Sequence, residues 1–273
     1  MVLIANEVVE EYRAKKKEGV VFKIDFEKAY DHISWEFLDF VLERKGFGNK
    51  WRSWIKGCIS SANFSVVING RPRGHFGASR RIRQGDPLSP FLLILVADVL
   101  SRLMKKACES SLIKGFEVGR NKVRISHLQF ADDSIFFVSN RDNCIKNLVG
   151  VIKLFSLVLG FKVDMGKSSH IAHELGCDSG SWPFTYLGLP LGGNPSSLSF
   201  WDPVIERIAK RVEGWHKGCL SRGGRLVLLQ SVLGSIPIYF LPLFKIPNKA
   251  VSILEKIMRD FFWEGKLRVK GVI

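Results

Sequence analysis

Cysteine is scarce in this sequence, and the cysteines it has are not paired. The five are odd in number, lie far apart and include no CxxC motif, which argues against a disulfide framework or a zinc ribbon and favours a reducing compartment. His170, His173 and Cys177 have the spacing of metal ligands, but no matching fourth ligand is nearby. A zinc site there is the weaker interpretation.

Long apolar runs are also missing. Phe91–Val96 is too short to span a membrane and runs into Asp98, and Val227–Ile246 is interrupted by a glutamine and two prolines. The N-terminus has neither the basic leader nor the apolar core of a signal peptide. We therefore expect no membrane association and a nuclear or cytoplasmic protein that is not secreted.

Acidic residues are too few to balance the basic ones. The 273 residues include 41 Lys and Arg against 26 Asp and Glu, a net charge of +15. This excess favours nucleic acid as a partner over an anionic membrane surface, although some stable proteins are simply basic. The densest basic patch contains no acid and is suited to gripping phosphates: Arg71, Arg73, Arg80, Arg81 and Arg83.

The order of periodic segments predicts a mixed first part and a helical last part. Helices are expected over Leu3–Lys17, from the N-cap Ser34 to Gly46, and over Lys50–Ser60, Ser89–Ala107, Asn143–Leu159, Trp201–His216, Gly224–Leu233 and Lys249–Trp263. Strands are expected over Val20–Asp25, Phe64–Ile68, Ile125–Phe130, Ile135–Val138, Phe161–Val163 and Thr185–Leu187. A segment rich in Gly, Ser and Pro, 192–199, predicts a boundary between domains 1–195 and 196–273.

Two acidic features stand out against this apolar pattern. Asp132 and Asp133 lie side by side at the tip of a predicted hairpin, and Asp25 is the acid that ends a buried strand. If the two strands are neighbours in one sheet, the three carboxylates meet at one edge and can hold two divalent metal ions for in-line phosphoryl transfer. The plainer alternatives are a polar turn at Asp132–Asp133 and a helix cap at Asp25.

The motifs resemble, in order, those of the reverse transcriptases of non-LTR retrotransposons, particularly the plant elements. The resemblance runs from Leu3 to about Trp263. It implies an α+β fold: a right-hand polymerase palm, with an antiparallel sheet backed by helices, followed by a helical thumb-like region whose basic face holds template–primer duplex. The family's fingers and endonuclease segments have no match here, so we expect a truncated chain that is weak or inactive in isolation.

Two motifs would carry the metals. Lys23–Asp31 resembles the first palm motif, and the resemblance makes Asp25 a ligand of both metal ions, the carbonyl of Phe26 a further ligand, and Tyr30 the steric gate against ribose. Phe130–Asp133 is similar to the third motif. It implies that Asp132 shares the metals with Asp25 and that Asp133 is a weaker or outer ligand.

Three further motifs would hold the substrates. Arg83–Pro90 resembles the second motif, which implies that Arg83, Gln84 and Gly85 lie at the incoming nucleotide and its template base. Gly160–Lys167 is similar to the fourth, in which Lys167 would be a general acid for departing pyrophosphate, although a solvated surface lysine is an equal alternative. In the fifth, Tyr186, Leu187 and Gly188 would position the primer 3′ end.

The resemblance therefore implies an RNA-directed DNA polymerase that uses two Mg²⁺ ions, replaceable by Mn²⁺. Its partners would be an RNA template, a DNA primer and deoxynucleoside triphosphates, and a truncated chain would also need the missing upstream part of the element. The rival interpretation is a non-catalytic remnant that binds nucleic acid through its basic surface.

Overall fold

The computed structural model describes residues 1–26, 30, 33–61, 63–77, 82–131, 133–159, 182–216 and 220–264. These fall into two compact units, Leu3–Gly180 and Ser181–Ile273. The domain boundary expected at 195 stays a prediction. Each unit is described separately.

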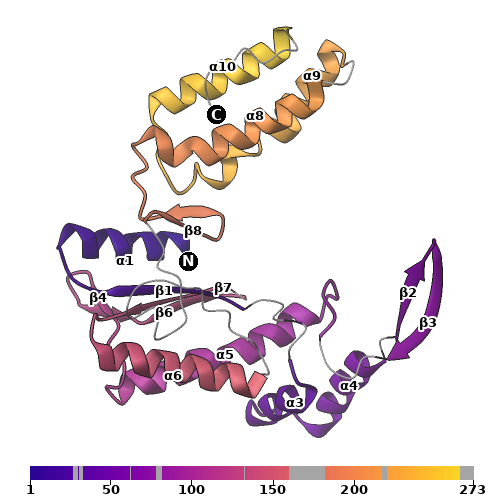
Figure 1. The fold of residues 1–273 in the computed structure, drawn as a ribbon, viewed down its shortest axis with the longest axis vertical. Coiled ribbons are helices and arrows are strands. Elements are labelled where there is room, and N and C mark those ends of the chain that lie inside the picture. The colour runs from indigo at the N-terminus through magenta and orange to yellow at the C-terminus, as the bar shows by residue number, and fades with distance from the viewer. Residues whose placement is uncertain are drawn as a thin grey trace. The chain divides into compact units, whose positions relative to one another are not determined.

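The first unit is built on a three-stranded antiparallel sheet. Its strands are β1 (Val20–Asp25), β6 (His127–Phe130) and β7 (Asp133–Val138), in the order β1-β7-β6. Helix α1 (Val2–Ala14) lies on one face of the sheet, and α5 (Ser89–Glu109) and α6 (Asp142–Leu159) lie on the other (Figure 1). The sheet is therefore the middle layer of three, which leaves the strand ends as the exposed edge.

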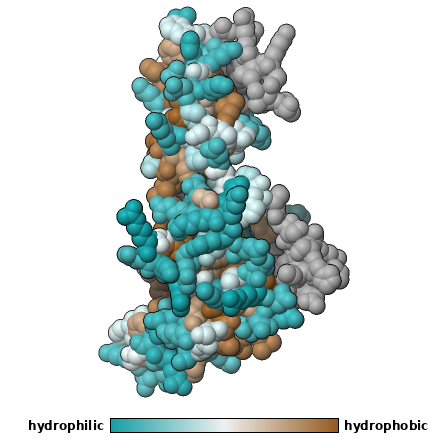
Figure 2. Space-filling view, turned by 90° about the vertical axis from the view of Figure 1, so that its left-hand side faces the viewer, coloured by the Kyte–Doolittle hydropathy of each residue, from teal (hydrophilic) through white to brown (hydrophobic). Residues whose placement is uncertain are grey.

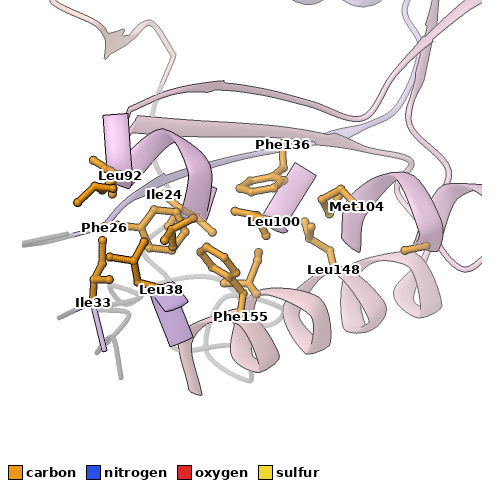
Figure 3. Packing of buried hydrophobic residues seen from close by; sticks show 14 of the residues in the cluster. Ile24, Phe26, Ile33, Leu38, Leu92, Leu100, Met104, Phe136, Leu148 and Phe155 are labelled. Atoms are coloured by element: carbon orange, nitrogen blue, oxygen red, sulfur yellow. The ribbon is translucent and has the colours of Figure 1, made fainter. Parts of the chain in front are cut away.

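The larger core lies between the sheet and the α5–α6 layer. Ile24 and Phe136 project from the sheet into it, and Phe26 meets Phe155 of α6 edge-on at 5.7 Å (Figure 3). On the α1 side, the buried rings of Phe116 and Phe137 lie 5.4 Å apart. Because alternate residues of one strand enter these two cores, a shift of register by one residue would expose both.

Helices and hairpins at the periphery complete the first unit. They are α3 (Trp35–Arg44), α4 (Asn49–Ser60), the hairpin β2 (Asn63–Ile68)–β3 (Arg71–Gly77), and the short pair β4 (Phe116–Val118)–β5 (Val123–Ile125). The predicted cap holds, since Ser34 accepts a hydrogen bond from the Phe37 amide. The predicted turn holds too, with Asn69 and Gly70 both at positive φ.

Two sequence expectations about this unit were wrong in detail. Pro90 directly after Ser89 predicts a helix that is capped by Ser89. In the structure Ser89 is the first residue of α5, and the N-cap is Leu88, whose side chain makes no capping bond. The strand expected over Ile125–Phe130 is broken at Ser126, so that β5 pairs with β4 and only β6 joins the central sheet. The alternation of apolar residues changes phase at the break, from Val123 and Ile125 to Leu128 and Phe130, and the expectation of one continuous strand overlooked that change.

The second unit is mainly helical. It contains the hairpin β8 (Phe184–Tyr186)–β9 (Leu189–Leu191), a 3₁₀ turn η1 (Leu198–Trp201), and the helices α8 (Asp202–His216), α9 (Arg222–Leu228) and α10 (Asn248–Glu264). The helix expected over Gly224–Leu233 ends early and continues as a π-helical turn, η2 (Leu229–Leu233), before the 3₁₀ turn η3 (Pro237–Tyr239). Trp201 is fully buried, and its indole donates to the Pro195 carbonyl at 2.9 Å.

Among the described residues, no helix has the length and apolar character that a membrane crossing requires.

Candidate active site

The end of the central sheet brings two of the predicted acidic positions together. In the antiparallel pairing of β1 and β7, Asp25 is the Cα partner of Asp133, at the last pair of the ladder. The conditional expectation that these strands are neighbours is therefore confirmed at the level of the backbone. Asp132 and the side chain of Asp25 lie outside the described part of the structure.

The turn that carries the acid pair is tight and conformationally unusual. Phe130 pairs with Asp133, so only two residues, Ala131 and Asp132, connect β6 to β7. Ala131 has a φ of +53°, a conformation that L-residues with a Cβ seldom adopt. Such backbone strain persists where surrounding structure holds it, and Ala131 packs against the main core beneath the turn.

A lysine compensates part of the charge at this edge. The Nζ of Lys23 lies 3.7 Å from Oδ1 of Asp133, and the Asp133 side chain is about one quarter exposed. Lys23 is on β1, two residues before Asp25, so all three positions belong to the same face of the sheet. No basic residue flanks Asp132 and Asp133 in the sequence, because the lysine that lies near Asp133 comes from β1, a strand distant along the chain.

The residues predicted to line the nucleotide site are linked by the backbone. The carbonyl of Tyr30 accepts a hydrogen bond of 2.8 Å from the amide of Ile82, the residue before Arg83. Arg83, Gln84 and Gly85 are exposed, and Gly85 has a φ of +87°, which glycine adopts without strain. The first and second motifs thus meet in space, as a shared site requires.

Other predicted site residues are in different surroundings. Phe26 is buried in the core, so its side chain is structural. In the second unit, Leu187 and Gly188 form the β8–β9 turn, both at positive φ, and Tyr239 donates to the Leu187 carbonyl at 2.7 Å. Tyr186 is fully buried. Lys167, His170, His173 and Cys177 fall outside the described residues.

Within the described part of the chain, no three His, Cys, Asp or Glu side chains form a group able to hold a metal ion. Asp132 and the side chain of Asp25 lie outside that part, so the predicted metal site stays a prediction. The predicted donors are carboxylates. Their chemistry suits Mg²⁺ or Mn²⁺.

A hydrogen-bonded group beside β6 was missed by sequence reasoning. Ser101 of α5 contacts both His127 and Gln129 of β6. The available signal was the presence of polar residues, Ser126, His127 and Gln129, in a stretch taken as an apolar strand.

The basic patch predicted from the sequence lies partly within the described residues. Arg71 and Arg73 lie on β3 and are exposed, as is Arg83, while Arg80 and Arg81 are outside the described residues. Figure 1 shows the β2–β3 hairpin extending away from the sheet beyond α4. Hydrophilic side chains cover most of the face in Figure 2.

Comparison with known proteins places the chain in a family. The family model described as "Reverse transcriptase (RNA-dependent DNA polymerase)" matches residues 3–191, and the chain belongs to that family. Members of the family generally use divalent metal ions. The resemblance to retrotransposon reverse transcriptases is confirmed by relatives of that kind.

The relatives are a retrotransposon polyprotein, a transposon protein and a plant protein. The chain is 26% identical over 171 residues to a retrovirus-related Pol polyprotein from a type-1 retrotransposable element R2 of Popillia japonica, covering 62% of this chain and 23% of the relative. It is 24% identical over 259 residues to an uncharacterised 149 kDa protein of transposon TX1 from Xenopus laevis, and the match covers 89% of this chain and 19% of the relative. It is 52% identical over 68 residues to an uncharacterised mitochondrial protein of Arabidopsis thaliana, and the match covers 25% of this chain and 56% of the relative.

The chain thus spans between about a fifth and just over half of the length of these relatives. The fold has a counterpart in the solved structure of a telomerase from Candida albicans. The two superpose with a TM-score of 0.50 at 13% identity, over 97% of this chain and 47% of the telomerase chain. The expected α+β polymerase fold is confirmed.

Proposed function

We propose that this chain is an RNA-directed DNA polymerase domain that adds deoxynucleotides to a primer 3′-OH on an RNA template. The observation that carries the proposal is the pairing of Asp25 with Asp133 at the end of the β1–β7 ladder, directly after the two-residue turn. Family membership supplies the reaction class.

The acids would hold the metal ions. Asp25 and Asp132 would be shared ligands of two Mg²⁺ ions, and Asp133, already near Lys23, would be the outer one. When bound, the metals supply Lewis-acid stabilisation of the charge that develops in phosphoryl transfer. The protein's own contribution is to hold three carboxylates at one edge through a strand ladder and a tight turn.

The remaining residues would bind and orient the substrates. Tyr30 would exclude the ribose 2′-hydroxyl, and the exposed Gln84 and Gly85 would lie against the nucleotide and template base. Lys167 would donate a proton to the departing pyrophosphate. Tyr186, Leu187 and Gly188 would position the primer end through the backbone of their turn.

The division at 195 into palm and thumb-like parts belongs to the same proposal. The basic helices of the second part would hold the template–primer duplex. Nuclear or cytoplasmic residence would follow from such a function, since both compartments contain RNA templates.

A metal-binding experiment tests this proposal. Mn²⁺ should raise the melting temperature of the parent, because a ligand at 100 times its Kd stabilises the folded state by about 2.7 kcal/mol. The double variant Asp25→Asn with Asp132→Asn should lose that response. A matched control, Glu109→Gln with Glu206→Gln, removes the same charge from exposed positions and should keep it.

The same variants separate the enzyme from a non-catalytic remnant. If the Asn double variant responds to Mn²⁺ as the parent does, the acid cluster is not the metal site. If the parent binds an RNA–DNA duplex and shows no metal response, the chain is a nucleic-acid-binding remnant.

A further inference from the structure

Among the described residues, the strand that leads into the acid turn lies at the edge of its sheet. β6 is hydrogen-bonded to β7 on one side, and no other described strand pairs with it. The ladder consists of four residue pairs, from His127–Phe136 to Phe130–Asp133. An edge strand this short is held weakly by its ladder alone, because half of its backbone groups face outward. The position of the turn therefore depends on what else fixes β6.

Side chains of α5 supply a second attachment. Nε2 of His127 lies 3.1 Å from the hydroxyl of Ser101, and that hydroxyl donates to Oε1 of Gln129 at 3.0 Å. Nδ1 of His127 lies 3.0 Å from the hydroxyl of Ser126.

The directions of these bonds follow from the donors available. The hydroxyl proton of Ser101 goes to Gln129, so the bond between His127 and Ser101 must use an Nε2–H donor. Nδ1 is then an acceptor, and the hydroxyl of Ser126 donates to it. The sequence of donors runs from Ser126 to His127, from His127 to Ser101 and from Ser101 to Gln129, so each proton is donated once.

The part of α5 that carries Ser101 is anchored in the main core. Leu100 and Met104, on either side of Ser101 in α5, are fully buried in the main core. The ring of His127 also lies over Phe136 of β7, with centroids 6.1 Å apart. Only two residues separate Gln129 from Asp132, so a shift of the strand against α5 moves the turn directly.

We propose that Ser101, His127 and Gln129 are positioning residues that hold the Asp132–Asp133 turn in place by fastening the edge strand to α5. The inference rests on the proposed function for its consequence, since the turn matters for chemistry only if its acids bind metal. Its structural part, the fastening of β6, is independent of that function.

The protonation state of His127 fits this role. Burial lowers the pKa of His127 below its ordinary value of 6.5, which keeps the imidazole neutral and Nδ1 free to accept. The surrounding elements carry Lys105 and Cys108 on α5 and Arg124 on β5, and burial, not these groups, is the cause of the shift. Acid would place a proton on Nδ1 and break the bond from Ser126.

The test compares two long-range tethers in the same unit. Ser101→Ala removes the link to β6, and Asn147→Ala removes the bond of 2.8 Å from Asn147 to the Leu112 carbonyl, away from the turn. Amide hydrogen exchange of residues 127–133 should rise about tenfold or more in the first variant, because both hydrogen bonds of Ser101 to β6 are lost, and stay unchanged in the second. Ser101→Thr, which keeps the hydroxyl, should restore protection.

A second measurement follows Mn²⁺ binding by the same variants. The Kd for Mn²⁺ should rise about five- to tenfold in Ser101→Ala and not in Asn147→Ala, even where both melt at the same temperature. Gln129→Leu gives the same comparison if Ser101→Ala does not fold. Unchanged exchange at 127–133, or an equal rise in Asn147→Ala, overturns the inference. A parent that does not bind Mn²⁺ overturns the proposed function, and exchange alone then decides whether the tether exists.

Discussion

The ammonium group of Lys23 lies 3.7 Å from the carboxylate of Asp133, across the β1–β7 pair and on the same sheet face as Asp25. The Lys23 ammonium therefore lies at the sheet edge where the proposed metal ions would bind. It lowers the repulsion between the acids when metal is absent, and it competes with metal when metal is present. Both effects can be measured.

Replacing Lys23 by Met should tighten Mn²⁺ binding. A fixed positive charge beside a divalent ion opposes its binding, by an amount on the order of 1 kcal/mol when water and salt screen the pair, so we expect the Kd to fall several-fold. Titration calorimetry measures the change, with Lys153→Met, an exposed lysine of α6, as the control. Equal or weaker binding by the Lys23 variant would contradict the assignment of the metals to this edge.

Replacing Ser134 by Ala should stabilise the protein. Its hydroxyl is buried, with the residue 1% exposed, and has no hydrogen-bond partner among the described residues. An unsatisfied buried polar group costs about 1 to 3 kcal/mol, so the free energy of unfolding should rise by about 1 kcal/mol. Urea denaturation gives the value. Ser156→Ala is the control, because that buried hydroxyl donates to the Ile152 carbonyl at 2.7 Å and its loss should not stabilise.

Replacing Gly115 by Ala should destabilise the first unit. A Cβ at this position would lie 2.6 Å from the Ile125 carbonyl oxygen and 3.0 Å from Cα of Ser126, so the backbone leading into β6 would have to move. Overpacking of this kind costs about 1 to 3 kcal/mol. Gly57→Ala, in the interior of α4 with nothing within 4 Å, should instead stabilise by about 1 kcal/mol through helix propensity. Equal effects of the two changes on thermal melting would refute the close approach.

The stability of the parent should depend on pH through His127. Because burial lowers the pKa in the folded state, the unfolded chain binds the proton first as pH falls. The stability contributed by the neutral imidazole is therefore fully present above about pH 6.5 and is lost as the pH falls toward the folded-state pKa. His127→Gln keeps a donor for Ser101 and does not titrate. Denaturation between pH 5 and 8 should show a shallower slope for this variant, and parallel slopes would exclude His127 as the cause.

Binding to an RNA–DNA duplex should weaken steeply with salt, because Lys and Arg release condensed counterions. Replacing Arg80, Arg81 and Arg83 by Ala should flatten the slope of log K against log salt by about 2 to 3, if each contacts one phosphate. Fluorescence anisotropy at several salt concentrations measures the slope. An unchanged slope would place the contact after residue 200, where three exposed basic residues of α10 form a matched set: Lys249, Lys256 and Arg259.

The sequence predicts the parts of this structure that depend on local chemistry. The Asn69–Gly70 turn and the Ser34 cap are found as expected, because each is determined by the conformational preference or hydrogen bonding of a few residues. The approach of Asp25 to Asp133 was predicted conditionally, from two apolar strands with acids at their ends.

What the sequence does not reveal depends on contacts between distant segments. The separation of β5 from β6 at Ser126 has only a weak local signal, a change of phase in the apolar alternation that a bulge within one strand would also produce. Lys23 near Asp133 and Ser101 between His127 and Gln129 are each pairings that only the folded chain creates. A side chain's partner across the sheet or on a helix is fixed by tertiary packing, which the pattern of one segment does not encode.

The register of the central sheet also has a consequence for the order of folding. β6 and β7 are joined by a two-residue turn, so their pairing closes a very short loop, whereas β1 must find β7 across more than a hundred intervening positions. Closing the longer loop costs more chain entropy and depends on the intervening helices. Asp132 and Asp133 are thus placed early, and Asp25 joins them only when β1 docks. The carboxylate cluster is complete at the last step of sheet formation, so a partly folded chain would not present it.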